Sequence, residues 1–267
     1  MKAVLGAEKP LIGMVHLLPL PGSYSHRGKG LRAVLERAFS DLAVLEEGGA
    51  DAALVENFGD VPFPKRVSKS TVAFMTAVVG ELVRRAGITI GVNVLRSDGE
   101  AALAVAAAAG ARFIRVNVFT GVAFTDQGII EGEAHRLLAL RKALGAGVAI
   151  FADVNVKHAW HPQPLELAAR DTARNLPDAL IVTGSGTGQA ACPEDLAQLK
   201  AAAGLPVLVG SGITPGNVAE YRAADGFIVG TSIKRDGDVH APVDPARVAA
   251  LAARIAMLRA GGTGQGV

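Results

Sequence analysis

The sequence lacks the features that mark disulfide-stabilised and nucleic-acid-binding proteins. Its single cysteine, Cys192, excludes an intrachain disulfide framework and fits a reducing compartment. Its 27 lysines and arginines nearly balance 25 acidic residues without blocks of like charge, which gives no support for binding nucleic acid. Half of all the residues are hydrophobic, which is the composition of a chain with a substantial core.

Signals for membrane insertion and export are also missing. The longest near-continuous apolar run, AALAVAAAAGA, is far shorter than the roughly 18 residues that suggest a membrane span. Glu8, Lys9 and Pro10 interrupt the start of the chain too early for a signal peptide. We therefore expect a cytoplasmic protein without integral membrane association.

Short apolar runs alternate with helical patterns along the whole chain. The runs are rich in Val, Ile or Leu and bounded by Gly, Pro or Asp, as buried parallel strands are. The segments between them carry apolar residues at spacings of three and four. Eight strand–helix units predict an α/β fold, a (β/α)8 or TIM barrel, as a single domain over residues 1–260 with a flexible tail at 261–267. A doubly wound open sheet is the alternative, but it usually has fewer strands. The predicted strands are LIGMVHL (11–17), ADAALVEN (50–57), ITIGVNVL (88–95), FIRVNVF (113–119), VAIFADVNVK (148–157), ALIVTG (179–184), PVLVGSG (206–212) and GFIVGTS (226–232).

The loops on the two ends of the predicted barrel differ in length. Helix-to-strand connections are short, such as GGA, AGI and GLP, whereas the strand-to-helix loops 1, 2, 4 and 8 are long and polar. Active sites of these barrels are built from the strand-to-helix loops. The elaboration of that end alone indicates a binding or catalytic function there.

Strands 6, 7 and 8 each end in glycine-rich sequence, VTGSGTG, LVGSGITPG and IVGTSIK. In this fold the loops after strands 7 and 8 commonly bind phosphate. Glycine lets backbone N–H groups approach an anion, and hydroxyl side chains add donors. The alternative is that the glycines only form tight turns. The predicted phosphate-binding residues are Gly184, Ser185, Gly186, Thr187, Gly210, Ser211, Gly212, Gly230, Thr231 and Ser232.

Alternation along the strands predicts polar side chains inside the barrel. In strand 5, Asp153, Asn155 and Lys157 share one face, and Val154 and Val156 share the other. The valines are expected to pack on helices, so the polar residues point inward near the mouth. The same reasoning applied to strands 1 to 4 directs further polar residues inward, His16 among them. The candidate catalytic residues are Glu56, Asn93, Arg115, Asn117, Asp153, Asn155 and Lys157.

These residues allow more than one chemistry. Asp153 and Glu56 are candidate acid–base carboxyl groups, and Lys157 is a candidate either to stabilise developing negative charge or to form a Schiff base. The alternative is an internal network in which Arg115 pairs with Glu56 or Asp153. The histidines do not have metal-ligand spacing, so no metal or other cofactor is predicted, although Glu56, Asp153 and substrate oxygens are suitable ligands for Mg²⁺.

Motifs spread over nearly the whole chain resemble the BtpA/SgcQ family of (β/α)8-barrel proteins. They include IGMVHLLPLPGS, ALVENFGDVPF, GVNVLRSDG, ADVNVKHA, PVLVGSGITPGNV and DGFIVGTSIKRDG, which are specific together although not singly. One branch of the family is named for photosystem I biogenesis, and another is associated with sugar-phosphate gene clusters. The resemblance implies a phosphorylated small-molecule ligand and isomerase, lyase or transferase chemistry.

Two functions are therefore predicted from the sequence. The first is an enzyme acting on a sugar phosphate or similar molecule, which the inward polar residues favour. The second is a non-catalytic, membrane-peripheral assembly or stability factor of the photosystem I biogenesis type, which the resemblance favours. Either is compatible with a homo-oligomer.

Overall fold

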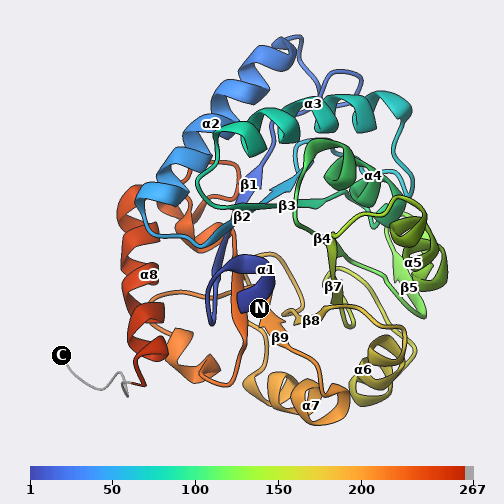
Figure 1. Cartoon of the computed structure of the whole chain (residues 1–267), viewed down its shortest axis with the longest axis vertical. Coiled ribbons are helices and arrows are strands. Elements are labelled where there is room, and N and C mark those ends of the chain that lie inside the picture. Colours follow the sequence, from blue (N-terminus) through green and yellow to red (C-terminus); the bar gives the residue numbers. More distant parts are fainter. Residues whose placement is uncertain (262–267) are drawn as a thin grey trace.

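The strands form a closed parallel barrel. The computed structural model describes residues 1–261, so the tail predicted at 261–267 lies outside the described residues except for Gly261. The barrel order is β1-β10-β9-β8-β7-β4-β3-β2, with β2 pairing back to β1, and every neighbouring pair is parallel (Figure 1). The TIM-barrel fold is thus confirmed. Its strands are β1 (Leu11–His16), β2 (Ala52–Glu56), β3 (Thr89–Asn93), β4 (Phe113–Val116), β7 (Ala149–Asp153), β8 (Ala179–Val182), β9 (Val207–Val209) and β10 (Gly226–Val229).

The helices surround this barrel. Several begin where the sequence offers a capping side chain: Ser68, Asp98 and Asp244 each accept a hydrogen bond from a backbone N–H three residues on. The short helix α1 lies over the centre of the barrel in Figure 1, where its buried Leu5 packs against the inner core. The α-helices are α1 (Lys2–Leu5), α2 (Gly30–Glu47), α3 (Lys69–Arg85), α4 (Gly99–Ala109), α5 (Ala134–Ala143), α6 (Leu165–Arg174), α7 (Pro193–Ala203) and α8 (Pro245–Arg259).

The seventh strand–helix unit differs from the regular pattern. A 3₁₀ helix, η1 (Val218–Tyr221), stands where the barrel pattern predicts an α-helix. Asn217 forms a turn just before it, accepting from the Thr214 N–H at 2.8 Å and donating to the Gly212 carbonyl at 2.9 Å. Few residues then separate η1 from β10, so the segment is too short for a longer helix.

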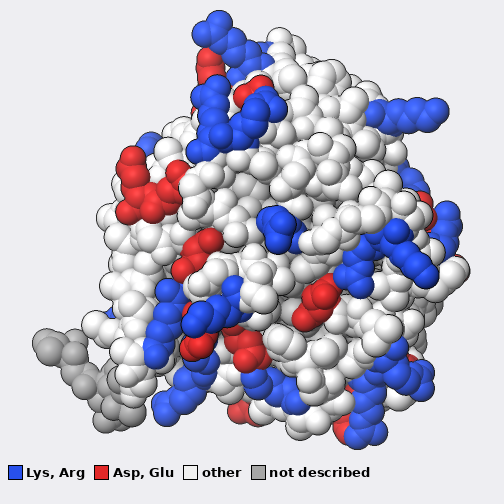
Figure 2. All heavy atoms as spheres, in the orientation of Figure 1, with Lys and Arg blue, Asp and Glu red and all other residues white. Residues whose placement is uncertain are grey.

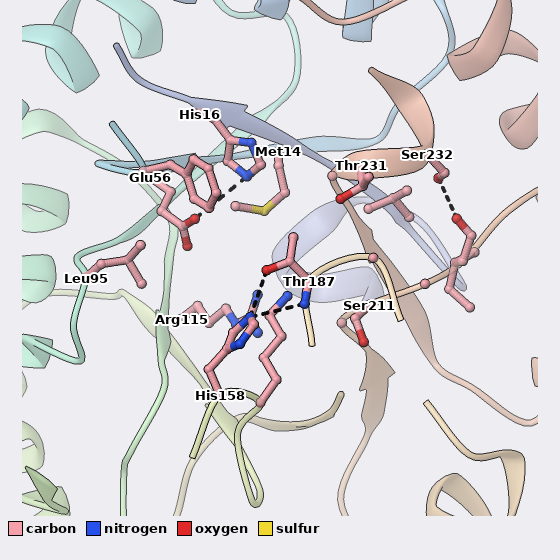
Figure 3. Close-up of a pocket in the computed structure, with 18 of the residues that line it drawn as sticks. Met14, His16, Glu56, Leu95, Arg115, His158, Thr187, Ser211, Thr231 and Ser232 are labelled. Atoms are coloured by element: carbon pink, nitrogen blue, oxygen red, sulfur yellow. Dashed lines mark hydrogen bonds and ion pairs between the residues drawn. The ribbon is translucent and has the colours of Figure 1, made fainter. Parts of the chain in front are cut away.

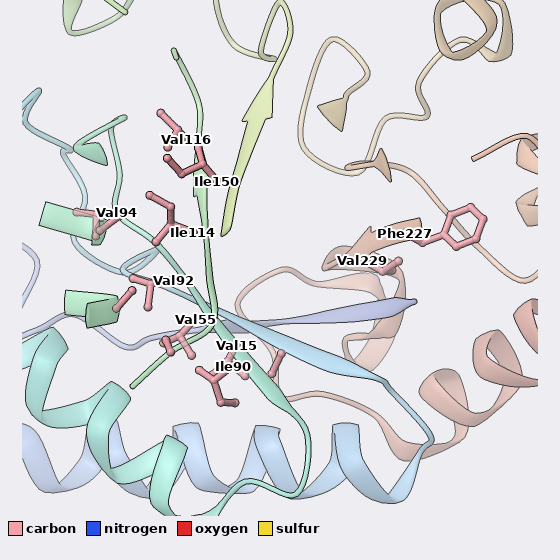
Figure 4. Packing of buried hydrophobic residues seen from close by; sticks show 14 of the residues in the cluster. Val15, Val55, Ile90, Val92, Val94, Ile114, Val116, Ile150, Phe227 and Val229 are labelled. Carbon is pink, nitrogen blue, oxygen red and sulfur yellow. The ribbon is translucent and has the colours of Figure 1, made fainter. Parts of the chain in front are cut away.

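Two apolar layers result from the strand alternation. Inward residues form the barrel core, in which the rings of Phe113 and Phe151 stack with centroids 4.9 Å apart. Outward residues such as Val15, Val55 and Ile114 pack under the helices in the larger outer core (Figure 4). Because both faces of the strands are buried, the strand sequences are nearly continuously apolar.

The predicted elaboration of the strand-to-helix loops is present. Loop 4 contains a hairpin, β5 (Val122–Thr125) with β6 (Gly128–Glu131), and loop 8 contains two 3₁₀ turns, η2 (Thr231–Ile233) and η3 (Arg235–Gly237). Lys234 fixes loop 8 to the outside of the barrel. Its fully buried ammonium lies 3.1 Å from the Asp41 carboxylate on α2, which also accepts from the Val243 N–H at 2.8 Å.

The charged surface is mixed. Figure 2 shows lysine and arginine interspersed with aspartate and glutamate on the face that carries α1. Across residues 1–261, no helix is both long and apolar enough to cross a membrane. In the same residues, histidine, cysteine and acidic side chains nowhere gather in groups of three or more that could hold a metal ion.

Candidate active site

A cavity of about 530 Å³ opens at the carboxyl ends of the strands (Figure 3). Its walls come from the ends of β1, β2, β4 and β10 and from the loops that follow β2, β3, β4, β7, β8, β9 and β10. This is the end at which the sequence predicted a site. The predicted residues that line the cavity are Glu56, Arg115, Asn117, Lys157, Thr187, Gly210, Ser211, Gly212, Gly230, Thr231 and Ser232.

The remaining predicted residues lie outside the cavity wall. Gly184, Ser185 and Gly186 belong to the β8 loop but do not line the cavity, and Asn93 and Asp153 are buried without lining it. Asn155 does not share the inward face predicted for it. Strand β7 ends at Asp153, and Asn155 adopts φ +49°, so alternation no longer applies there. Its side chain instead donates to the Gln163 carbonyl at 3.3 Å.

Packing alone requires glycine at two of the predicted phosphate-binding positions. A Cβ on Gly184 would lie 2.4 Å from the Gln189 carbonyl oxygen, and one on Gly212 would lie 2.2 Å from backbone atoms of Ala190. Gly212 also has φ +68°. Gly184 therefore allows the loop after β8 to fold closely on itself, and Gly212 allows the loop after β9 to contact it. For these two glycines the structure has the turn-forming alternative.

We expect Gly212→Ala to lower the free energy of unfolding by about 3 kcal/mol, because the added methyl group meets backbone that cannot move aside. Gly216→Ala in the same loop is the matched control. Its nearest contact would be Thr214 Oγ1 at 3.7 Å, and its φ is not in the left-handed region, so a change within about 0.5 kcal/mol is expected. Denaturant melts of both variants measure the difference; equal stabilities would show that the loops separate easily.

The hydroxyl groups of the predicted phosphate loops are partly engaged by the protein. Ser232 Oγ donates to the Ile213 carbonyl at 2.5 Å, and Ser211 Oγ accepts from the Gly184 N–H at 2.6 Å. Thr187 contacts His158, whose Nε2 accepts from the Thr187 N–H at 3.1 Å (Figure 3). These contacts position the loops. They leave Thr231 as the hydroxyl side chain of this wall with no hydrogen bond to the rest of residues 1–261.

A buried ion pair joins the cavity wall to strand β7. Arg115 on β4 donates to Asp153 on β7 through Nε at 3.0 Å and Nη2 at 3.0 Å, and the Asp153 side chain is 0% exposed. Burial disfavours the charge of Arg115, but Asp153 raises the pKa of Arg115 above its ordinary value. Of the two pairings predicted for Arg115, the structure has the one with Asp153. Asp153 therefore neutralises a buried cation and does not itself face the cavity.

Two asparagines continue from this pair toward Glu56. Asn117 Nδ2 donates to Asp153 at 2.8 Å, and the side chains of Asn117 and Asn93 meet at 3.0 Å. Asn93 in turn lies 3.1 Å from Glu56 Oε2. Parallel pairing of Glu56, Asn93 and Arg115 in one register across β2, β3 and β4 brings these groups together.

Glu56 is the carboxyl group that reaches the cavity. Burial raises the pKa of Glu56, against the opposing effects of Arg115, Lys157 and Arg96. His16 lies beside it, with Nε2 at 3.7 Å from Glu56 Oε1 and Nδ1–H donating to the Val239 carbonyl at 3.3 Å (Figure 3). Burial lowers the pKa of His16 to about 3, so its imidazole is neutral near pH 7.

Three further cations line the cavity. Within residues 1–261, Arg96, Lys157 and Arg247 form no ion pair, although Arg96 donates to the Lys157 carbonyl at 2.7 Å. Burial lowers the pKa of Lys157 to about 8, and nearby Arg115 acts in the same direction. Arg96 is buried and Lys157 is half-buried, whereas Arg247 is exposed. Buried cations without a partner are costly, so the part of the cavity near Arg96 and Lys157 is suited to an anionic ligand.

The sequence profile of the BtpA family matches residues 7–257. The chain belongs to the BtpA family. An uncharacterised protein of Thermococcus kodakarensis is 53% identical over 87% of this chain and 89% of its own length. The photosystem I biogenesis protein BtpA of Synechocystis is 48% identical over 91% of this chain and 86% of its own length.

Solved structures of other barrels share the BtpA-family fold. Thiamine phosphate pyrophosphorylase from Pyrococcus furiosus gives a TM-score of 0.60 at 14% identity, covering 94% of this chain and 96% of that one. The 3-keto-L-gulonate-6-phosphate decarboxylase from Vibrio cholerae gives 0.57 at 12% identity, covering 94% and 99%. At these identities the likeness establishes the fold alone.

Arg96 and Arg247 are the two arginines of the cavity that sequence reasoning missed in this member of the BtpA family. Arg96 lies in the loop after β3, within the motif LRSDG, and its position on the strand-to-helix end was a signal that could have been used. Arg247 lies in the first turn of α8, where periodicity alone does not separate a residue facing the site from one facing solvent.

Proposed function

We propose that this BtpA-family protein is an enzyme that acts on a phosphorylated small molecule, such as a sugar phosphate, by isomerase, lyase or transferase chemistry. The observation that carries the proposal is the composition of the cavity. One wall is made of the loops after β9 and β10, and the other presents Glu56, Arg96 and Lys157. A scaffold has no need for buried cations without protein partners, because they lower stability.

The phosphate is proposed to bind the first wall. In residues 1–261, the backbone N–H groups of Ser211 and Gly212 have no acceptor, and Thr231 begins the 3₁₀ turn η2 in the neighbouring loop. Arg247 adds a positive charge on the same side of the cavity. Backbone donors and a cation together favour a tetrahedral dianion.

The reacting part of the substrate is proposed to face the second wall. There Glu56 is in reach as an acid or base, and Lys157 and Arg96 can stabilise negative charge that develops on an oxygen. Asp153 acts indirectly, by holding Arg115 in place. The acid–base role predicted for either carboxyl group is therefore proposed for Glu56.

Inorganic phosphate should stabilise the wild-type protein against thermal unfolding, by about 2.7 kcal/mol at one hundred times its dissociation constant. We expect Thr231→Asp to abolish this effect, because a carboxylate repels the anion. Thr231→Val keeps the shape and the backbone N–H, so it should retain most of the effect. The melts are run in phosphate and in chloride at matched ionic strength. A full shift in Thr231→Asp would mean that phosphate binds elsewhere.

A second candidate function is a non-catalytic assembly factor, favoured by the name of the Synechocystis relative at 48% identity. A product assay over a panel of phosphorylated sugars separates the two. Turnover of any member supports the enzyme, whereas binding of panel members with no turnover supports the assembly factor.

A further inference from the structure

We infer that one proton is bound to the pair of carboxyl groups Glu56 and Asp153, and that the hydrogen bonds of the amides between them place this proton on Glu56. The four side chains form a continuous row: Glu56, Asn93, Asn117 and Asp153. The row has three links, of 3.1, 3.0 and 2.8 Å in that order. The side chains of the row contact one another through hydrogen bonds, and no ligand takes part in these contacts.

Counting donors decides the protonation state. Each primary amide turns its nitrogen to one neighbour in the row and its oxygen to the other, so two amides supply two donors for three links. If both carboxyl groups are ionised, one link must place two acceptors in contact. Turning the Asn93 amide does not remove this conflict. It gives Glu56 a donor at 3.1 Å but brings the Asn93 oxygen to 3.0 Å from Asn117 Oδ1. One proton on either carboxyl group supplies the missing donor.

The surroundings place that proton on Glu56. Asp153 already accepts from Arg115 Nε and Nη2, and so its end of the row is saturated with donors. At the other end, no arginine or lysine of the described chain forms an ion pair with Glu56. The groups that face it are Asn93 from β3, neutral His16 from β1, and the more distant charges of Arg96, Arg115, Lys157 and Asp153.

With the proton on Glu56, every link has one donor. Glu56 donates to Asn93 Oδ1, Asn93 Nδ2 donates to Asn117 Oδ1, and Asn117 Nδ2 donates to Asp153. Buried amide chains with each group satisfied are rigid and resist reversal. Glu56 thus enters the cavity as a neutral carboxylic acid that can give its proton to a substrate oxygen gaining negative charge. This catalytic use rests on the proposed function, whereas the protonation state does not.

Carbon-13 NMR of the carboxyl carbon of Glu56 tests the inference on the wild-type protein without any ligand. The signal is assigned by its loss in Glu56→Gln. We expect the shift of a protonated carboxyl group at pH 7, with titration above that pH. An ionised Glu56 at pH 7 overturns the inference. A failure of phosphate to bind in the melts would overturn the proposed function and leave this result unchanged.

Asn117→Leu tests whether the amide row is the cause. With Asn117 gone, Asn93 is free to turn its nitrogen to Glu56 and to accept from the Val94 N–H at 3.1 Å. The pKa of Glu56 should then fall by at least about one unit, a tenfold loss of proton affinity. If burial alone sets the protonation, the apolar substitution leaves this pKa unchanged or raises it, and the row has no part in it. Thr231→Val, a cavity variant outside the row, should leave the titration of Glu56 as in the wild type.

Discussion

Replacing Asp153 with asparagine is expected to lower the free energy of unfolding by about 3–5 kcal/mol. The variant leaves the buried Arg115 guanidinium without a counter-charge. It also turns an amide N–H toward donors, because both Asp153 oxygens accept from Arg115 in the wild type. Urea melts at pH 7 measure the loss.

Glu36→Gln is the matched control for Asp153→Asn. Glu36 pairs with Arg32 at 2.8 Å on the surface, where the two side chains are 63% and 90% exposed. Such pairs contribute at most about 1 kcal/mol. If Asp153→Asn is as stable as Glu36→Gln and yet loses turnover, Asp153 is catalytic after all.

Lys157→Met should lower turnover of a phosphorylated substrate by about a hundredfold or more, because it removes a preorganised cation from the cavity. Lys157→Arg keeps the charge and cannot form a Schiff base. Partial activity in Lys157→Arg with little in Lys157→Met indicates an electrostatic role. Equal loss in both, with a borohydride-trapped adduct on the wild-type lysine, indicates a Schiff base. Full activity in Lys157→Met excludes either role.

The pH dependence of the wild type separates the same two roles. The folded-state pKa of Lys157 is about 8. If the cation is required, the rate falls as the pH rises through about 8; if the free amine is required, the rate rises there. The effect of the lowered Lys157 pKa on the free energy of unfolding has the same direction whichever role the residue has. The unfolded chain binds the proton up to its ordinary pKa of about 10.4, so between these values the contribution of Lys157 to stability increases with pH.

The fold could be predicted because its signals are local and repeated. Each strand reads as a short buried run, and loop length alone distinguishes the two ends of the barrel. Strand alternation also found Glu56 and Arg115, which line the cavity from β2 and β4. Lys157 lines the cavity too, but from the loop beyond the end of β7, where alternation does not apply. The prediction failed at Asn155, because alternation requires extended backbone and β7 ends two residues earlier.

Depth along the barrel axis could not be read from the sequence. Asp153 and Glu56 both point inward, yet only Glu56 reaches the cavity, since the level of a residue depends on the stagger between strands. The glycine at 212 shows a second limit. Its sequence context is that of an anion-binding loop, but the need for glycine comes from a contact with Ala190 in another loop.

The buried pair between Lys234 and Asp41 links the cavity to the periphery. Lys234 follows the η2 turn directly, and Asp41 belongs to a helix on the outside of the barrel. A shift of α2 against the strands would pull on the turn that begins at Thr231. No residue of α2, which the structure describes in full, lines the cavity. If the proposed phosphorylated ligand binds there, substitutions in α2 as well as in the cavity wall would be expected to alter its affinity.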